Sequence, residues 1–166
     1  RQKTMKELLF TGLAVSMVMR TPDQGTIEAM FGDPDANIGL VTGHKNLLVL
    51  DFDDPGAFRK FADAYAGLMR EAPIVRSPDG WHLYVRTPAP LATSSVYRGM
   101  RRIGHVKSLG GYVVCPPSRL ASGGGYTWEN GHSVYEKAPP EIPDLSALGL
   151  SQVSPLKSAY DRALGR

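Results

Sequence analysis

One short segment constrains the fold of this 166-residue chain more than any other. The run Leu48-Val49-Leu50 does not alternate between polar and apolar residues, which is typical of a β-strand buried on both faces. It leads into Asp51, Phe52 and Asp53. Residues two apart in a strand point to the same side, so we expect the carboxylates of Asp51 and Asp53 to lie together at the carboxyl end of a buried strand.

Two neighbouring carboxylates repel each other unless a cation lies between them. Oxygen ligands favour Mg²⁺ or Mn²⁺, so this pair is a candidate metal site. A simpler interpretation is that Asp53 and Asp54 cap a following helix and that Asp51 only ends the strand. The sequence leaves both interpretations open.

The chain order predicts strands mixed with helices, which is an α/β or α+β fold with helices covering a sheet. One helix follows the cap-like Thr21-Pro22, and the apolar spacing predicts a second over 55–70 and a third over 154–164. The predicted strands are Ile38–Val41, Asn46–Phe52, Ile74–Arg76, His82–Val85, Tyr112–Cys115 and Tyr126–Trp128.

Length and composition bound the organisation of the chain. We expect one domain over 1–137, followed over 138–166 by a Pro-rich linker and a helix that leads to a downstream domain. The apolar run 8–19 is too short to span a bilayer, and we expect a buried strand or helix there, or else a targeting segment. A hydrophobic content of 42% excludes a disordered or collagen-like chain.

Charge and cysteine content give two further expectations. The net charge of +3 does not by itself indicate a nucleic-acid-binding protein, but the stretch 97–107 carries Arg98, Arg101, Arg102 and Lys107 and no acid. We expect the three arginines to contact a nucleic-acid backbone. A single cysteine excludes an intrachain disulfide and fits the reducing cytoplasm.

Two polar segments lie downstream of the carboxylates. The turn Ser77-Pro78-Asp79-Gly80 can direct backbone N–H groups and a hydroxyl at an anion, and His82 adds a donor beside it. In a strand, His105 and Lys107 would share a face.

Four segments in this order resemble the primase-polymerase (Prim-Pol) domain of the archaeo-eukaryotic primase superfamily, of the type found in plasmid and phage replication proteins. They are Asn-Ile-Gly-Leu-Val-Thr-Gly from position 37, the strand with Asp51 and Asp53, the turn with Gly-x-His-Leu-Tyr, and Gly-Gly-Tyr-Val-Val-x-Pro-Pro-Ser with Ser-Gly-Gly-Gly-Tyr-x-Trp. The resemblance covers about 37–130. It implies a central mixed sheet with helical cover, an RRM-like half carrying the later strands, and an active cleft between the halves.

The resemblance also implies a two-metal nucleotidyl transferase. His105 stands where the family usually has a third metal-binding acid, which leaves either a variant ligand or a domain without catalysis, and Asp54 and Glu129 are possible substitute acids. The implied roles are catalytic for Asp51, Asp53 and His82, metal-binding for Asp51, Asp53 and His105 with Mg²⁺ or Mn²⁺, and nucleotide-binding for Ser77, Gly80, His82 and Lys107.

The function expected from these residues is template-directed DNA primase/polymerase activity in the replication of a mobile element, plasmid or phage. Its partners would be a single-stranded DNA template, a primer and nucleoside triphosphates, with a helicase domain downstream and no membrane. Two alternatives remain: a catalytically silent module that binds nucleic acid or nucleotides, and a metal-dependent phosphohydrolase or nuclease.

Overall fold

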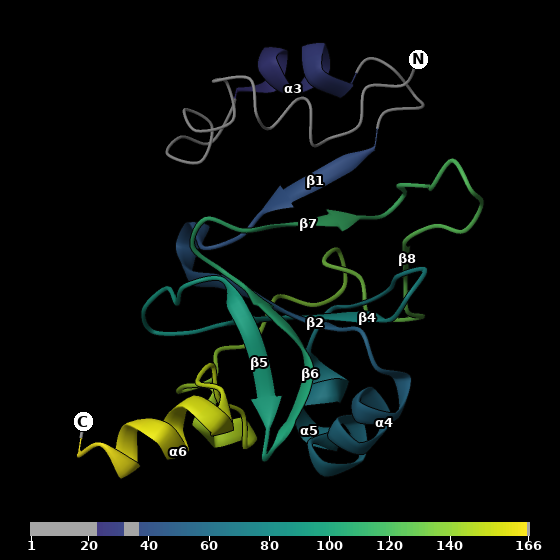
Figure 1. Cartoon of the computed structure of the whole chain (residues 1–166). Helices are drawn as coiled ribbons and strands as arrows, with labels where there is room; N and C mark the ends of the chain where they lie inside the picture. The colour runs from purple at the N-terminus through teal and green to yellow at the C-terminus, as the bar shows by residue number, and fades with distance from the viewer. Residues whose placement is uncertain (1–22, 32–36, 166) are drawn as a thin grey trace.

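Two antiparallel sheets form the framework of the protein (Figure 1). The structure is a computed structural model that describes residues 23–31 and 37–165. The larger sheet has the strand order β5-β6-β2-β4-β3-β8, and the smaller sheet pairs β1 with β7. The strands are β1 (Ile38–Val41), β2 (Leu47–Phe52), β3 (Ile74–Arg76), β4 (Trp81–Arg86), β5 (Ser94–Arg98), β6 (Arg101–Lys107), β7 (Tyr112–Cys115) and β8 (Thr127–Trp128).

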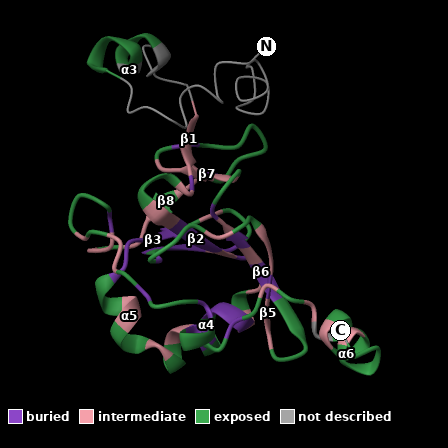
Figure 2. Ribbon diagram, turned by 90° about the vertical axis from the view of Figure 1, so that its left-hand side faces the viewer, coloured by how far each residue is buried: buried purple, intermediate pink, exposed green. Residues whose placement is uncertain are grey.

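Helices cover one face of the large sheet and the small sheet lies over the other (Figure 2). No described helix is long and apolar enough to cross a membrane. The helices are α3 (Gln24–Phe31), α4 (Pro55–Ala64), α5 (Ala66–Glu71) and α6 (Pro155–Ala163), with short 3₁₀ helices η1 (His44–Asn46) and η2 (Ser146–Leu148).

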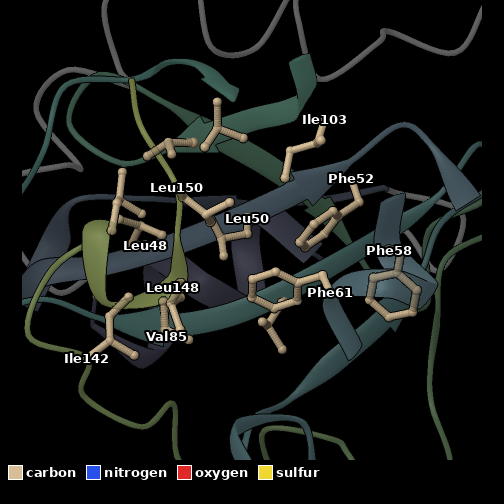
Figure 3. Packing of buried hydrophobic residues seen from close by; sticks show 14 of the residues in the cluster. Leu48, Leu50, Phe52, Phe58, Phe61, Val85, Ile103, Ile142, Leu148 and Leu150 are labelled. Carbon is tan, nitrogen blue, oxygen red and sulfur yellow. The ribbon is translucent and has the colours of Figure 1, made fainter. Parts of the chain in front are cut away.

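Strand β2 lies at the centre of the large sheet and is buried on both faces, as the sequence predicts. Leu48, Leu50 and Phe52 point into the larger core, where Phe52 packs against the rings of Phe58 and Phe61 on α4 (Figure 3). Val49 points the opposite way, into a smaller cluster below β7. Asp51 follows Val49 by two residues, and so it belongs to the face that the small sheet covers.

The α+β class is confirmed, and the sheet differs from the expectation in one respect. Every pairing between named strands is antiparallel, where a mixed sheet was expected. Of the later strands that the sequence predicts, β7 lies in the small sheet with β1, whereas β8 lies at the edge of the large sheet that contains β2. Strands β1, β3 and β7 have the predicted bounds, whereas β5 and β6 were not predicted as strands.

The predicted helix over 55–70 is two helices. Tyr65 leaves the helical conformation, with φ −124° and ψ 41°, and separates α4 from α5. Its ring packs on Phe61 at a centroid distance of 4.8 Å and lies below the guanidinium of Arg98. Phe61 and Tyr65 are four residues apart, the spacing of neighbours on a helix, so the break lies in the backbone at Tyr65 and not in the apolar spacing of the segment.

The other two helices are present where the sequence predicts them. Asp23 accepts a hydrogen bond from the N–H of Thr26 and so caps the start of α3, whereas the expected cap Thr21 lies outside the described residues. α6 begins after Ser154. The run 8–19 also lies outside the described residues.

The segment predicted as a linker packs against the domain as far as residue 150. Ile142, Leu145, Leu148 and Leu150 are each at most 6% exposed and belong to the larger core. Arg86 of β4 donates its N–H to the carbonyl of Pro140 and accepts a hydrogen bond from the N–H of Ile142. The prolines therefore mark an extended strap, and its apolar residues bury surface that the sheet leaves open.

Candidate active site

Asp51 lies in a row of polar side chains that crosses three strands. It pairs in register with His82 of β4 on one side and with His105 of β6 on the other. Lys107 stands two residues beyond His105, opposite Val49, and so it shares the face of Asp51. The antiparallel register thus brings to Asp51 three groups that lie 31 to 56 positions from it in the sequence.

An open hollow of about 320 Å³ lies between this row and the β7 segment. Asp51, His82 and Lys107 line it from the large sheet. The opposite wall and the rim consist of Thr93, Gly110, Gly111, Tyr112, Val113, Val114 and Tyr126. The hollow therefore offers one carboxylate, one imidazole and one ammonium group, with two phenol rings beside them.

His82 is the most buried polar group of the hollow, at 6% exposure. Its Nε2 lies 3.5 Å from Oδ1 of Asp51, and its Nδ1 has no hydrogen-bond partner among the described residues. Burial lowers the pKa of His82, Asp51 opposes that shift, and Lys107 adds to it. His82 is therefore a neutral imidazole at pH 7.

The turn before β4 is closed on itself. Ser77 accepts the N–H of Gly80 with its hydroxyl and donates its own N–H to the carbonyl of Gly80. A Cβ at Gly80 would lie 1.8 Å from the carbonyl oxygen of Phe52, so the glycine lets the turn approach the end of β2. Neither Ser77 nor Gly80 lines the hollow.

A second polar group lies at the end of β2. Asp53 pairs with Arg102, whose Nη2 is 2.8 Å from Oδ2, and the same nitrogen lies 3.1 and 3.4 Å from the two ring nitrogens of His105. Burial lowers the pKa of His105, and Lys107 and Arg102 lower it further. At pH 7 the imidazole of His105 is therefore neutral beside the Arg102–Asp53 pair.

Asp54 has the capping role that the simpler interpretation gives it. Its Oδ1 accepts the N–H groups of Gly56 and Ala57 at the start of α4, and its Oδ2 pairs with Arg101. The hydrogen bond from Ala57 makes the largest contribution to the lowered pKa of Asp54. Its oxygens are committed to these contacts, and so Asp54 is a poor substitute for a metal-binding acid.

As the residues stand, the carboxylate of Asp51 is open to a divalent cation and that of Asp53 is not. Asp51 is 25% exposed at the side chain and opens into the hollow. Asp53 is already paired with Arg102. Among the residues that the structure describes, no three His, Cys, Asp or Glu side chains converge closely enough to hold a metal ion. The predicted set Asp51, Asp53 and His105 is thus not assembled as a ligand cluster.

The predicted residues therefore separate into different places. Asp51, His82 and Lys107 meet at the hollow, and Asp53 and His105 meet at Arg102. Arg98 lies over the ring of Tyr65, with Cζ 5.8 Å from the ring centroid. Glu129, Ser77 and Gly80 are outside the lining of the hollow.

Sequence reasoning missed the aromatic part of the site. Tyr126 lines the hollow and its ring centroid lies 5.8 Å from that of His82. Burial raises the pKa of Tyr126, and Asp51 raises it further. Both Tyr112 and Tyr126 follow glycine runs that the sequence marks as turns. A tyrosine directly after a glycine turn indicates that the residue lies at or near the start of a strand. It does not indicate to which face of the sheet the ring points.

The fold and the hollow together define a class of protein: an α+β domain in which a strand ends in aspartates, beside side chains that can donate hydrogen bonds to a phosphate. The chain belongs to the family described as "Bifunctional DNA primase/polymerase, N-terminal" (Prim-Pol), which it matches over residues 16–145. No curated protein sequence matched the chain. The family assignment confirms the resemblance and supports a primase/polymerase-type nucleotidyltransferase that binds nucleic acid and nucleoside triphosphates.

Proposed function

We propose that the domain extends or initiates a DNA strand on a template, with the nucleoside triphosphate bound in the hollow. The observation that supports this most is the meeting of Asp51, His82 and Lys107 at one open hollow in a chain of this family. In the reaction, a strand hydroxyl forms a bond to the α-phosphorus. The bond from that phosphorus to the bridging oxygen breaks, pyrophosphate leaves, and the hydroxyl proton passes to water.

The residues of the hollow have separate tasks in this proposal. Lys107 donates to the triphosphate, and His82 donates through whichever ring nitrogen carries its proton. Asp51 is the proposed ligand for a Mg²⁺ or Mn²⁺ ion, and Asp53 becomes a second ligand only when it leaves Arg102. Such a cation, when bound, draws charge from the phosphate oxygens. The walls of the hollow hold the reactants in position, which is a large part of catalysis in phosphoryl transfer.

The nucleic-acid strand is proposed to lie along the β5–β6 hairpin, where Arg98, Arg101 and Arg102 are exposed or half-buried. Two of these arginines pair with carboxylates, so a phosphate must exchange with those partners. We propose the replication of a mobile element, plasmid or phage, in the cytoplasm, as the setting, because the single half-buried thiol fits a reducing compartment.

Primer extension tests the proposal. The full chain is incubated with a primed template, deoxynucleoside triphosphates and Mg²⁺ or Mn²⁺. We expect incorporation, and a loss of about 100-fold or more in Asp51→Asn, since a carboxylate charge beside the reacting phosphates is removed. Lys107→Gln should weaken nucleotide binding, whereas Lys60→Gln on the exposed face of α4 serves as the matched control.

A catalytically silent binding module is the second candidate. The pairing of Asp53 with Arg102 and the presence of His105 favour it, because they leave the predicted metal ligands unassembled. If neither metal supports incorporation while single-stranded DNA still binds, the polymerase proposal fails and the silent module replaces it. Release of phosphate without strand growth would instead indicate a phosphohydrolase.

A further inference from the structure

Arg102 is brought to the candidate site by an irregularity in β6. The register between β5 and β6 shifts at Val96 and Tyr97, which leaves Ile103 as an extra residue. Residues three apart on a regular strand face opposite sides, but the β-bulge turns Arg102 to the side of His105. Ile103 itself points into the larger core, at 2% exposure. The bulge thus places a guanidinium among the predicted metal ligands.

The contact of Arg102 with His105 is made over the ring. One nitrogen lies 3.1 Å from Nε2 and 3.4 Å from Nδ1. The lone pairs of the two ring nitrogens diverge in the plane of the ring, so a single donor at both distances must lie against the face of the ring. The guanidinium therefore neutralises Asp53 and stacks on His105 without occupying the ring nitrogens.

Arg101 provides a comparison on the next residue. It carries the same charge and is also exposed, but it pairs with Asp54, which caps α4. Of these two arginines, Arg102 alone contacts two of the predicted metal ligands, Asp53 and His105. The Arg102–Asp53 pair is also largely exposed, at 42% and 41% of the two side chains, and pairs of this kind are weak enough to exchange.

From this arrangement we propose that Arg102 is a resident cation of the site, which holds Asp53 in place of a divalent metal ion and competes with that ion for the carboxylate. The proposal rests on the proposed function, because it takes Asp51 and Asp53 as the metal-binding carboxylates. When Arg102 leaves Asp53, a second ligand becomes available beside Asp51. Arg102 thereby sets how much divalent cation the site needs.

Mn²⁺ binding, followed by the electron paramagnetic resonance of the free ion, tests the proposal without relying on activity. Arg102→Gln removes a positive charge that opposes a doubly charged ion over a few ångströms. We expect Mn²⁺ to bind about tenfold more tightly to this variant at low salt. Arg101→Gln is the matched control and should change the affinity by no more than about threefold, because its charge lies against Asp54 and is screened by solvent. Arg102→Lys keeps the charge and should stay close to the wild-type protein.

Two further variants, Asp53→Asn/Arg102→Gln and Asp51→Asn, decide between the outcomes. In Asp53→Asn/Arg102→Gln the gain should disappear, since the freed carboxylate is its cause. The role of Arg102 is refuted if Arg102→Gln binds Mn²⁺ no more tightly than Arg101→Gln, or if the gain in Mn²⁺ affinity remains when Asp53→Asn is added. The proposed function still stands in that case, provided that Mn²⁺ binding depends on Asp51. If Mn²⁺ at millimolar concentration binds to no variant, or binds equally to Asp51→Asn, both the metal site and the role of Arg102 are wrong.

Discussion

Gly80→Ala separates two explanations for the glycine beside His82. In the structure, a Cβ at Gly80 would lie 1.8 Å from the carbonyl oxygen of Phe52 and 2.9 Å from its carbonyl carbon. Both atoms belong to the backbone of the central strand, so the turn must move away by more than an ångström. Overpacking of this kind costs about 1–3 kcal/mol in the free energy of unfolding. With a urea dependence of about 2 kcal/mol per molar, the unfolding midpoint should fall by about 1 M.

Urea unfolding followed by circular dichroism measures this loss. Gly67→Ala is the control, because its Cβ would meet no atom closer than 3.9 Å and α5 gains a better helix former. That change should leave the midpoint unchanged or raise it by the equivalent of about 0.5 kcal/mol. The nucleotide-binding role predicted for Gly80 gives the opposite pattern. If Gly80→Ala keeps the wild-type midpoint but loses nucleotide affinity, the packing argument is refuted.

Three other predictions concern single groups. Burial raises the pKa of Cys115 to about 11, so about one thiol in a thousand is ionised at pH 8. Ellman's reagent should therefore react much faster with the protein unfolded in urea than with the folded protein. Equal rates would contradict this prediction. Asp54→Ala should lower the urea midpoint because the cap of α4 is lost. Asp54→Asn can still accept both N–H groups, so its midpoint should stay close to that of the wild-type protein. Because burial lowers the pKa of His82, the unfolded chain takes up a proton here before the folded protein does as the pH falls below about 6.5. The free energy of unfolding should therefore be lower at about pH 5.5 than at about pH 7.5. The difference between the two pH values should be smaller in His82→Gln. A difference of the same size in that variant would exclude His82 as the cause.

The sequence predicts the centre of the fold well because its signals there are local. An apolar run without alternation, an aspartate and a proline are enough to predict β2 and the start of α4. The capping role of Asp54 also follows from residues next to it in the chain. By contrast, the sequence suggests that Asp53 acts with Asp51, whereas the structure pairs Asp53 with a residue 49 positions away.

The hairpin of β5 and β6 was missed because its residues give little strand signal. Arg98-Gly99-Met100-Arg101 reads as a charged loop, and the strand propensity of Val96 and Ile103 is spread over a bulge. β6 forms by pairing with β2, and β5 by pairing with β6. The pairing of β6 with β2 spans a long separation in the sequence and depends on tertiary contacts. The strap around Ile142 was missed for a similar reason, since its prolines indicate a linker until a core is present to bury its apolar residues.

The same pairing changes the meaning of the basic stretch 97–107. In the sequence this stretch carries four positive charges and no acid. In the structure, Arg101 and Arg102 are each paired with a carboxylate at the junction of β2 and α4. Acidic and basic segments that look like two separate binding surfaces thus meet in one surface, where two of the four basic residues are paired with carboxylates. A DNA phosphate that approaches the arginines and a metal ion that approaches Asp53 must break the same ion pair. Because each of them takes one partner of that pair, binding of one frees the partner that the other needs, and the two ligands should favour each other's binding.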